Sequence, residues 1–342
     1  MKPIVEIKPL ETSDFETVSE LFMQQSSRQH GLDERLRRFS LDEVHAYLDK
    51  MKKDQRDLLM IKDEAGRAQA VALLYVFEYP DDSSMLALFP QHCGVAGMMS
   101  LPAPTDPHAA AIADAMVPAA EEYWQSKGAT GGILAWPSAD PWLQPLLNQQ
   151  GYVTYSTLAV RPGNDLPDHP HPPPKGLTIR PAQPADEAMV AKLIVDQIAF
   201  HVGITPFDRV VPGTEIGARE RMARVWSGDD PRDGASIFLV AEMDGQIAGM
   251  IEFGLSDFRD KWSYLAPDYY GYISIAMVAE AFRGQGIGHY LLAAALNDLK
   301  RYGVGRFSLH YVPDNPLSSP FWQSKGYRPL MITYQKRYTK DA

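Results

Sequence analysis

The sequence has almost no cysteine and no long hydrophobic run. Cys93 is the single cysteine among 342 residues, which excludes an intramolecular disulfide and favours a reducing, cytoplasmic location. A nucleophilic role for Cys93 is one interpretation, but a thiol packed in a strand is favoured. No run of roughly 18 apolar residues occurs, so we expect no membrane span. The opening stretch MKPIVEIKPLETSDFE lacks the apolar core of a signal peptide.

Basic residues are also in the minority. The chain has 33 Lys and Arg against 43 Asp and Glu, a formal net charge of −10. Proteins that bind nucleic acid usually present a basic face, so we expect no nucleic-acid partner. An acidic surface is mildly compatible with a cationic substrate such as an amine. The length exceeds the roughly 100–200 residues of one domain, which predicts more than one.

The two halves of the sequence repeat one pattern. Several residue pairs lie 175 positions apart, and Ile7 and Pro9 recur as Ile179 and Pro181, 172 positions later. The pairs at 175 are Gly128 and Gly303, Asp140-Pro141 and Asn315-Pro316, Pro145 and Pro320, and Gly151-Tyr152 and Gly326-Tyr327. We interpret this series as a tandem duplication.

Between the repeats lies a segment rich in proline. Residues 161–176, RPGNDLPDHPHPPPKG, contain six prolines and predict a linker stiffened toward polyproline II. His169 and His171 lack Cys or carboxylate neighbours at ligand spacing, so we expect no metal site there.

The most informative stretch of the second repeat runs from Tyr272 to the helical pattern after Gly288. Residues 272–278, YISIAMV, predict a buried strand, and Arg283-Gly284-Gln285-Gly286-Ile287-Gly288 follows as a glycine-rich turn. The N-terminus of a helix offers free N–H groups and partial positive charge, and glycines allow close approach of a ligand. This order favours a phosphate or pyrophosphate site, although a tight turn without a ligand explains three glycines equally well.

Two common phosphate motifs do not fit this turn. His289 and Tyr290 follow the last glycine, where the Walker motif requires Lys and Ser or Thr. The glycines at 284, 286 and 288 also miss the Rossmann spacing.

The pattern Arg-x-x-Gly-x-Gly after a strand resembles the acetyl-CoA-binding motif of the GNAT family, the GCN5-related N-acetyltransferases. The segment SLHYVPDNPLSSPFWQSKGYRPL (308–330) resembles the next strand, Asn and short helix of that family, so the resemblance covers about 177–338. It implies an α+β fold of two tandem GNAT-like domains, each a mixed, mostly antiparallel sheet flanked by helices. Residues 1–160 are expected to form a degenerate domain, 161–176 the linker, and 177–342 the catalytic domain.

The resemblance also implies how acetyl-CoA, as co-substrate and without a metal, is held. The turn residues Arg283, Gly284, Gln285, Gly286, Ile287 and Gly288 are expected to bind the pyrophosphate. The strand positions Ala276, Met277 and Val278 are expected to pair with the pantetheine arm, with the Val278 N–H facing the thioester oxygen. Asn315 is expected to touch the cofactor, and it also fits the N-cap of the next helix.

The duplication suggests that only one copy retains this site. Arg283, Gly286 and Gly288 correspond to His108, Ala111 and Ala113, so the first copy lacks the arginine and two glycines. We expect it to bind acetyl-CoA poorly; the alternative is a first site adapted to another ligand.

Catalytic residues are predicted less firmly. Glu252 is favoured as the general base because it lies in an apolar strand pattern; the alternative is that it points to solvent. His310, Glu280 and His201 are the other candidates. The family's acidic tyrosine is replaced by Trp322, which has no usable acid proton, so Tyr327, Tyr311 or water is expected to protonate the thiolate.

The acceptor is the least defined part of the site. Residues 201–226 and 256–271 are expected to surround it, and the second segment contains Trp262 and three tyrosines with Asp257, Asp260 and Asp268. This composition fits an aromatic and acidic mouth for an amine, or a surface loop packed by its own side chains.

The function expected from these patterns is N-acetylation of the primary amine of a small molecule, in a cytoplasmic enzyme that could form a homodimer. The alternatives are acetylation of a protein or peptide amine, and a non-catalytic acyl-CoA sensor, for which Trp322 is the best argument.

Overall fold

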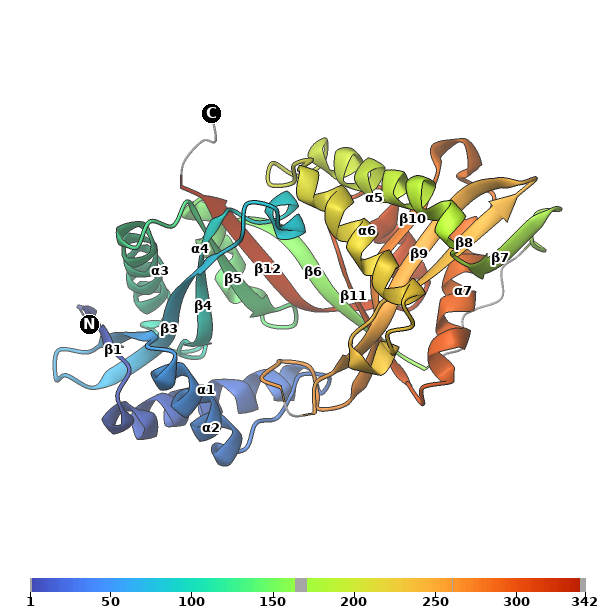
Figure 1. The fold of residues 1–342 in the computed structure, drawn as a ribbon. Coiled ribbons are helices and arrows are strands. Elements are labelled where there is room, and N and C mark those ends of the chain that lie inside the picture. The colour runs from blue at the N-terminus through green and yellow to red at the C-terminus, as the bar shows by residue number, and fades with distance from the viewer. Residues whose placement is uncertain (1, 164–170, 260, 339–342) are drawn as a thin grey trace.

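The first half of the chain forms six strands and four α-helices. The computed structural model describes residues 2–163, 171–259 and 261–338 (Figure 1). The first-half elements are β1 (Ile4–Pro9), η1 (Thr12–Asp14), α1 (Phe15–Leu32), α2 (Leu41–Lys53), β2 (Asp57–Lys62), β3 (Ala68–Glu78), η2 (Ser84–Ala87), β4 (His92–Ser100), α3 (Ala109–Ser126), β5 (Gly131–Pro137), η3 (Pro141–Leu143), α4 (Gln144–Gln149) and β6 (Val153–Pro162).

The second half repeats this order. Its elements are β7 (Leu177–Pro181), η4 (Pro184–Asp186), α5 (Glu187–Val202), α6 (Pro212–Trp226), η5 (Pro231–Asp233), β8 (Ile237–Met243), β9 (Gln246–Asp257), β10 (Tyr269–Val278), η6 (Glu280–Phe282), α7 (Ile287–Lys300), β11 (Arg306–Tyr311), α8 (Ser318–Ser324) and β12 (Arg328–Arg337). The repeated order of strands and α-helices is what a duplication predicts.

Local sequence signals explain several element boundaries. Ser40 caps α2 in a capping box with Glu43. Asp244 and Gly245 both adopt positive φ, at 50° and 78°, and join β8 to β9 in a tight hairpin. Ser13 does not cap α1, because a 3₁₀ turn precedes the helix and Asp14 occupies the cap position.

The twelve strands of the described residues belong to one sheet. Its order is β1-β2-β3-β4-β5-β12-β6-β11-β10-β9-β8-β7. The final strands of the two halves are exchanged: β12 pairs with β5 of the first half, β6 pairs with β11 of the second, and β6 and β12 pair with each other. Figure 1 shows β12, in red, lying beside the green β5. The two expected domains are therefore joined edge to edge by main-chain hydrogen bonds.

The expected linker begins later than predicted. Arg161 and Pro162 belong to β6, where they pair with Phe307 and Arg306. The prolines at 167 and 170 and His169 lie outside the described residues. His171 is described, and its carbonyl accepts a hydrogen bond from Tyr290.

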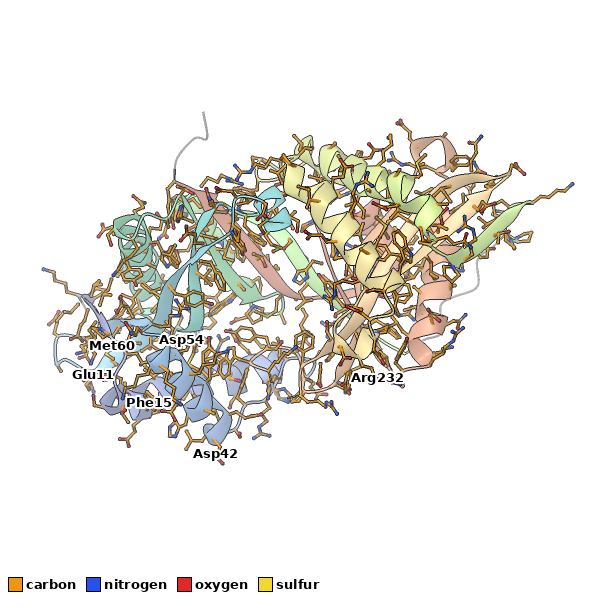
Figure 2. All side chains as sticks on the ribbon, viewed as in Figure 1. Glu11, Phe15, Asp42, Asp54, Met60 and Arg232 are labelled. Atoms are coloured by element: carbon orange, nitrogen blue, oxygen red, sulfur yellow. The ribbon has the colours of Figure 1, made fainter. Side chains whose placement is uncertain are left out.

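Helices cover both faces of the second-half sheet. Alternate residues of a strand face opposite sides, so Val240 and Met250 pack with α5 and α6, while Ala241 and Ile251 pack with α7. The first half repeats this arrangement with α1 and α2 on one face. Phe15 of α1 and Met60 of β2, labelled in Figure 2, lie in that core.

Each half also extends a loop onto the helices of the other. Trp262, between β9 and β10, stacks on Tyr47 of α2 with ring centroids 4.0 Å apart, and on Phe39 at 4.5 Å. In the reverse direction, the first-half loop that contains Asp82 packs on the start of α6. It lies so close to Gly213 that a Cβ at this position would be 2.2 Å from the Asp82 carbonyl oxygen. The expectation that Trp262 helps to form an aromatic mouth for the acceptor is wrong, because Trp262 packs against the first half.

Candidate functional site

The site begins where two parallel strands separate. β10 and β11 pair from Tyr270 opposite Arg306 to Ile273 opposite Leu309, and no pairing between them continues beyond that point. β10 remains paired with β9 as far as Val278, after a bulge between Ile273 and Ile275. β11 instead continues along β6 of the first half. The two strands therefore diverge and leave the end of β10 with a free edge.

The register shows which main-chain groups face this gap. Ala279 donates its N–H to Ala248 of β9, so this pair is in a hydrogen-bonded position. Antiparallel pairs alternate between hydrogen-bonded and non-bonded positions, so Val278 and Ala276 direct their N–H and C=O groups away from β9. The Val278 C=O accepts from Arg283, and the two N–H groups and the Ala276 C=O are open to a ligand that lies along the edge.

The glycine turn closes one end of the gap. Gly284 and Gly286 have φ of 79° and 80°, the left-handed region that glycine adopts without strain, and Gly286 is the N-cap of α7. The free N–H groups of the first turn of α7 and its dipole therefore point toward the cavity.

A cavity of about 390 Å³ lies between β10, β11, α5, α7 and α8. Nine of the ten expected cofactor-binding residues line it: Ala276, Met277, Val278, Arg283, Gly284, Gly286, Ile287, Gly288 and Asn315. The exception is Gln285, whose side chain is exposed and does not line the cavity. The structure therefore brings two separate sequence segments together with Asn315.

Two cations lie in the cavity wall. Arg283 donates from Nε to the Val278 carbonyl at 3.2 Å and lies over the Phe200 ring at 5.3 Å. Lys325 lies 3.1 Å from His289 Nδ1, and burial lowers its pKa. With the α7 N-terminus, these cations suit an anionic group such as a pyrophosphate. Lys325 was not among the residues expected from the sequence. The repeat could have indicated it, because the residue 175 positions earlier in the first copy is the neutral Gln150.

Asn315 has two roles in the structure. Its Oδ1 accepts from the N–H groups of Leu317 and Ser318 and so organises the turn into α8. Its Nδ2 lies 3.0 Å from Nε2 of His201, whose Nδ1 lies 3.2 Å from Asp208 Oδ2. Nε2 of His201 is thus occupied by the Asn315 amide, which leaves it poorly placed to act as a base in this conformation.

Glu252 is buried and paired. It is 1% exposed, which rules out the interpretation that it points to solvent. Arg221 of α6 donates from Nε to Oε1 at 2.7 Å and from Nη2 to Oε2 at 3.0 Å, and the Ser236 hydroxyl donates to Oε1 at 2.7 Å. Glu252 does not line the cavity. These contacts make it a structural anchor for α6 rather than a free proton acceptor.

We expect Arg221→Ala to lower the free energy of unfolding by about 3 kcal/mol, because it leaves the Glu252 carboxylate buried without its cation. Chemical denaturation measures this. Arg219→Ala on the same helix is the matched control: its ion pairs with Glu187 and Glu215 are more exposed, so we expect a much smaller loss of stability. Equal effects of the two variants would contradict the anchoring role.

His310 lies in the cavity at the point where β10 and β11 separate. Its Nδ1 lies 2.9 Å from the Tyr272 hydroxyl, and Nε2 has no hydrogen-bond partner among the described residues. The side chain is exposed to the cavity, but the surrounding protein disfavours the imidazolium and lowers the pKa of His310 to about 4. Burial, and then the charge of Glu252, raise the pKa of Tyr272 to about 12. At neutral pH the cavity therefore contains a neutral imidazole held by a protonated tyrosine.

The remaining catalytic candidates are placed differently. Tyr327 is fully buried, its hydroxyl has no partner within the described chain, and it does not line the cavity. Tyr311 and Trp322 do line it. Glu280 lies in the turn before Arg283 and is outside the lining. Cys93 is buried in β4, and burial raises its pKa to about 12, as expected for a packed thiol.

The first half lacks the corresponding polar groups. The β4–β5 pairing of Cys93 with Gly131 corresponds to the β10–β11 pairing of Tyr270 with Arg306. Counting along each strand from these pairs places Val95 at the position of Tyr272 and Ala135 at the position of His310. Trp136, at the position of Tyr311, packs in one core cluster with Leu101, Ala113 and Leu147. Apolar side chains therefore occupy the space that forms a cavity in the second half.

The first half instead supports the expected acceptor region, 201–226. Arg209, between α5 and α6, donates its N–H to the Ala87 carbonyl at 3.0 Å and its Nε to the Leu86 carbonyl at 2.9 Å. Tyr155 of the exchanged strand β6 donates to Asp208 at 2.8 Å. In the part of the chain that the structure describes, no group of three or more His, Cys, Asp or Glu that could hold a metal ion occurs.

Comparison with a family profile identifies part of the chain. Residues 211–327 match the family described as "Acetyltransferase (GNAT) family". This match contains the glycine turn, the diverging strands and Asn315. A comparison with curated proteins gives no significant match.

Solved structures resemble the whole chain. A GCN5-related N-acetyltransferase from Sphaerobacter thermophilus shares 15% identity with a TM-score of 0.59, covering 99% of this chain and 98% of its own. A tandem GNAT protein from the clavulanic acid biosynthesis pathway, solved without acetyl-CoA, shares 14% at 0.50, covering 99% and 100%. A GCN5-related glucosamine N-acetyltransferase region of a fungal β-N-acetylglucosaminidase shares 14% at 0.54, covering 98% and 38%. At these identities the likeness concerns the fold.

Proposed function

We infer that this chain is a tandem GNAT protein with a GNAT-family acetyltransferase domain in its second half. From this premise we propose that it transfers the acetyl group of acetyl-CoA to a primary amine. The second half is the proposed site of the reaction. The observation that supports it best is the coincidence, around one cavity, of the free β10 edge, the glycine turn before α7 and two cations.

The residues of the cavity suit each part of such a co-substrate. N–H groups at the start of α7, with Arg283 and Lys325, offer positive potential for the pyrophosphate. The N–H groups of Ala276 and Val278 and the C=O of Ala276 can pair with the amides of a pantetheine arm, as an added strand does. The Val278 N–H would then face the thioester oxygen as it gains negative charge.

His310 is the proposed proton acceptor. In the reaction the amine nitrogen attacks the thioester carbon, the C–S bond breaks, and the nitrogen loses a proton while the thiolate gains one. His310 lies at the strand divergence, its Nε2 has no hydrogen-bond partner among the described residues, and it is neutral at pH 7. Its lowered pKa makes it a weaker base than a free imidazole, so it is suited to take the proton, directly or through water, once the nitrogen has bonded to the carbonyl carbon and become more acidic. Tyr311 is the cavity tyrosine available to protonate the thiolate, and a thiolate with a pKa of about 8.5 can also leave unassisted.

A small acceptor suits the surroundings of the cavity better than a protein. Two contacts bring the first half against the segment between α5 and α6: Arg209 on the carbonyls of η2, and Tyr155 on Asp208. An enclosed approach limits the size of the amine that can enter. Free-thiol release from acetyl-CoA over a panel of polyamines, amino sugars, amino acids and lysine peptides tests this. Release with peptides alone would favour the protein-acetylating alternative.

A non-catalytic acyl-CoA sensor is the second candidate. It rests on Trp322, which lines the cavity at the position of the family's acidic tyrosine. Binding of acetyl-CoA without thiol release on any amine would support it, and release on one amine would exclude it.

The protonation of His310 gives an acid-side prediction. Its pKa is about 4 in the folded chain and about 6.5 in an unfolded one. Between these values the unfolded chain binds a proton that the folded chain does not, so falling pH disfavours folding across this window. We expect the His310 ring to titrate by NMR near pH 4, and His310→Gln to make stability less dependent on pH between about 4 and 6.5. A midpoint near 6.5 would contradict the lowered pKa of His310.

A further inference from the structure

The first half closes its own strand edge with a side chain. Gln25 of α1 is 4% exposed, and its amide bridges two main-chain groups at the end of β4. Its Nε2 donates to the Met99 carbonyl at 2.7 Å, and its Oε1 accepts from the Leu101 N–H at 2.7 Å. One amide group therefore satisfies both a donor and an acceptor along a free strand edge.

The same edge in the second half can be located through the sheet register. Cys93 pairs with Gly131 and Tyr270 with Arg306, so equivalent β4 and β10 positions differ by 270 − 93 = 177. Met99 and Leu101 therefore correspond to Ala276 and Val278. These are the two residues whose main-chain groups face the cavity.

The helix that supplies Gln25 has an equally clear counterpart. Asp14 precedes α1 and pairs with Lys8, as Asp186 precedes α5 and pairs with Arg180, an offset of 172. That offset places Gln197 at the position of Gln25.

Gln197 is in a different state from Gln25. It lines the cavity together with Ala276 and Val278. Its Oε1 is buried and has no hydrogen-bond partner among the described residues. A buried polar atom without a partner is unusual in a folded protein and is costly unless a ligand or water completes it.

We propose that Gln197 is a positioning residue for the amide-containing arm of the co-substrate. The Gln25 contacts show that a single amide, placed on this edge, accepts from one N–H and donates to one C=O. In the second half that place is open for an amide of the pantetheine arm, and Gln197 hydrogen-bonds the arm from the helix side. Gln25 fills the same place in the first half and excludes the arm there. This inference rests on the proposed function, since it assigns a contact to the same site.

Isothermal titration of Gln197→Met tests the contact, because Met keeps the length of Gln and removes its hydrogen bonds. We expect the Kd of coenzyme A to rise about 3- to 10-fold, the effect of one hydrogen bond. The Kd of 3′-phosphoadenosine 5′-diphosphate, which lacks the arm, should stay unchanged, and so should the melting temperature. Gln197→Glu keeps an acceptor oxygen and should restore part of the affinity if Oε1 makes the contact.

Gln25→Met is the matched control in the first half. It should leave both Kd values unchanged and lower the melting temperature, because it leaves the Leu101 N–H and Met99 C=O without partners. Unchanged coenzyme A binding in Gln197→Met, with normal binding by the wild type, would overturn the role of Gln197 alone. If the wild type binds neither ligand, the proposed function fails instead. A loss of affinity for both ligands in Gln197→Met would point to a general distortion and would also overturn the proposal.

Discussion

Gly286→Glu is expected to raise the Kd of coenzyme A by more than about 100-fold in isothermal titration. Gly286 has a φ of 80° and caps α7, so a Glu there takes a left-handed conformation that costs about 1–2 kcal/mol. Its carboxylate also replaces an open approach to the helix N-terminus with a negative charge, where the proposed pyrophosphate is negative. Repulsion and strain act in the same direction, and both act at the cofactor.

Two controls separate these causes. Gly286→Ala introduces the same backbone strain without the charge, so we expect a smaller loss of affinity. Ala111→Glu introduces the charge at the corresponding, exposed position of the first half, and it should leave the affinity unchanged. Coenzyme A binding by Gly286→Glu within threefold of the wild type would place the cofactor elsewhere.

His310→Ala is expected to lower kcat about 100-fold while the Kd of acetyl-CoA changes by less than about threefold. A positioned general base typically contributes about 10²- to 10⁴-fold. The main-chain edge of β10 and the turn before α7, which are proposed to hold the cofactor, are unaffected by this substitution. Thiol release under saturating amine measures kcat, and titration measures the Kd.

His108→Ala is the matched control, because His108 is exposed and lies in the first half. It should keep full activity. Tyr272→Phe removes the hydroxyl that lies 2.9 Å from Nδ1 of His310, and an intermediate loss is expected if that contact orients the ring. Full activity in His310→Ala would assign the proton to water or to another group.

The glycine turn and the strand beside it were predictable because their sequence signals are local. Glycines at 284 and 286 were expected for a turn that the structure shows in the left-handed region. Ala276 and Val278 were expected from the family resemblance, and the alternation along the strand explains why their N–H groups face the gap. Gln285 is the exception within this set: its side chain points to solvent, and a motif does not distinguish main-chain from side-chain contacts.

The catalytic side was less predictable because it depends on distant partners. An apolar strand pattern around Glu252 indicated a buried carboxylate, but it gave no sign that Arg221, 31 residues away, would pair with it. Trp262 was expected near the acceptor, yet its ring stacks on Tyr47, which lies far away in the chain. Contacts of this kind are set by tertiary packing, which periodicity and spacing do not report.

The strand exchange leaves no trace in the hydrophobic pattern, and it has a consequence for synthesis. β5 pairs with β4 on one side and with β12, which ends at Arg337, on the other. While the ribosome makes the second half, β5 exposes an unpaired edge, which is a site for wrong pairing or aggregation. We therefore expect the first half to complete its sheet only after β12 has left the exit tunnel, and a premature stop in β12 to destabilise the half that was made first.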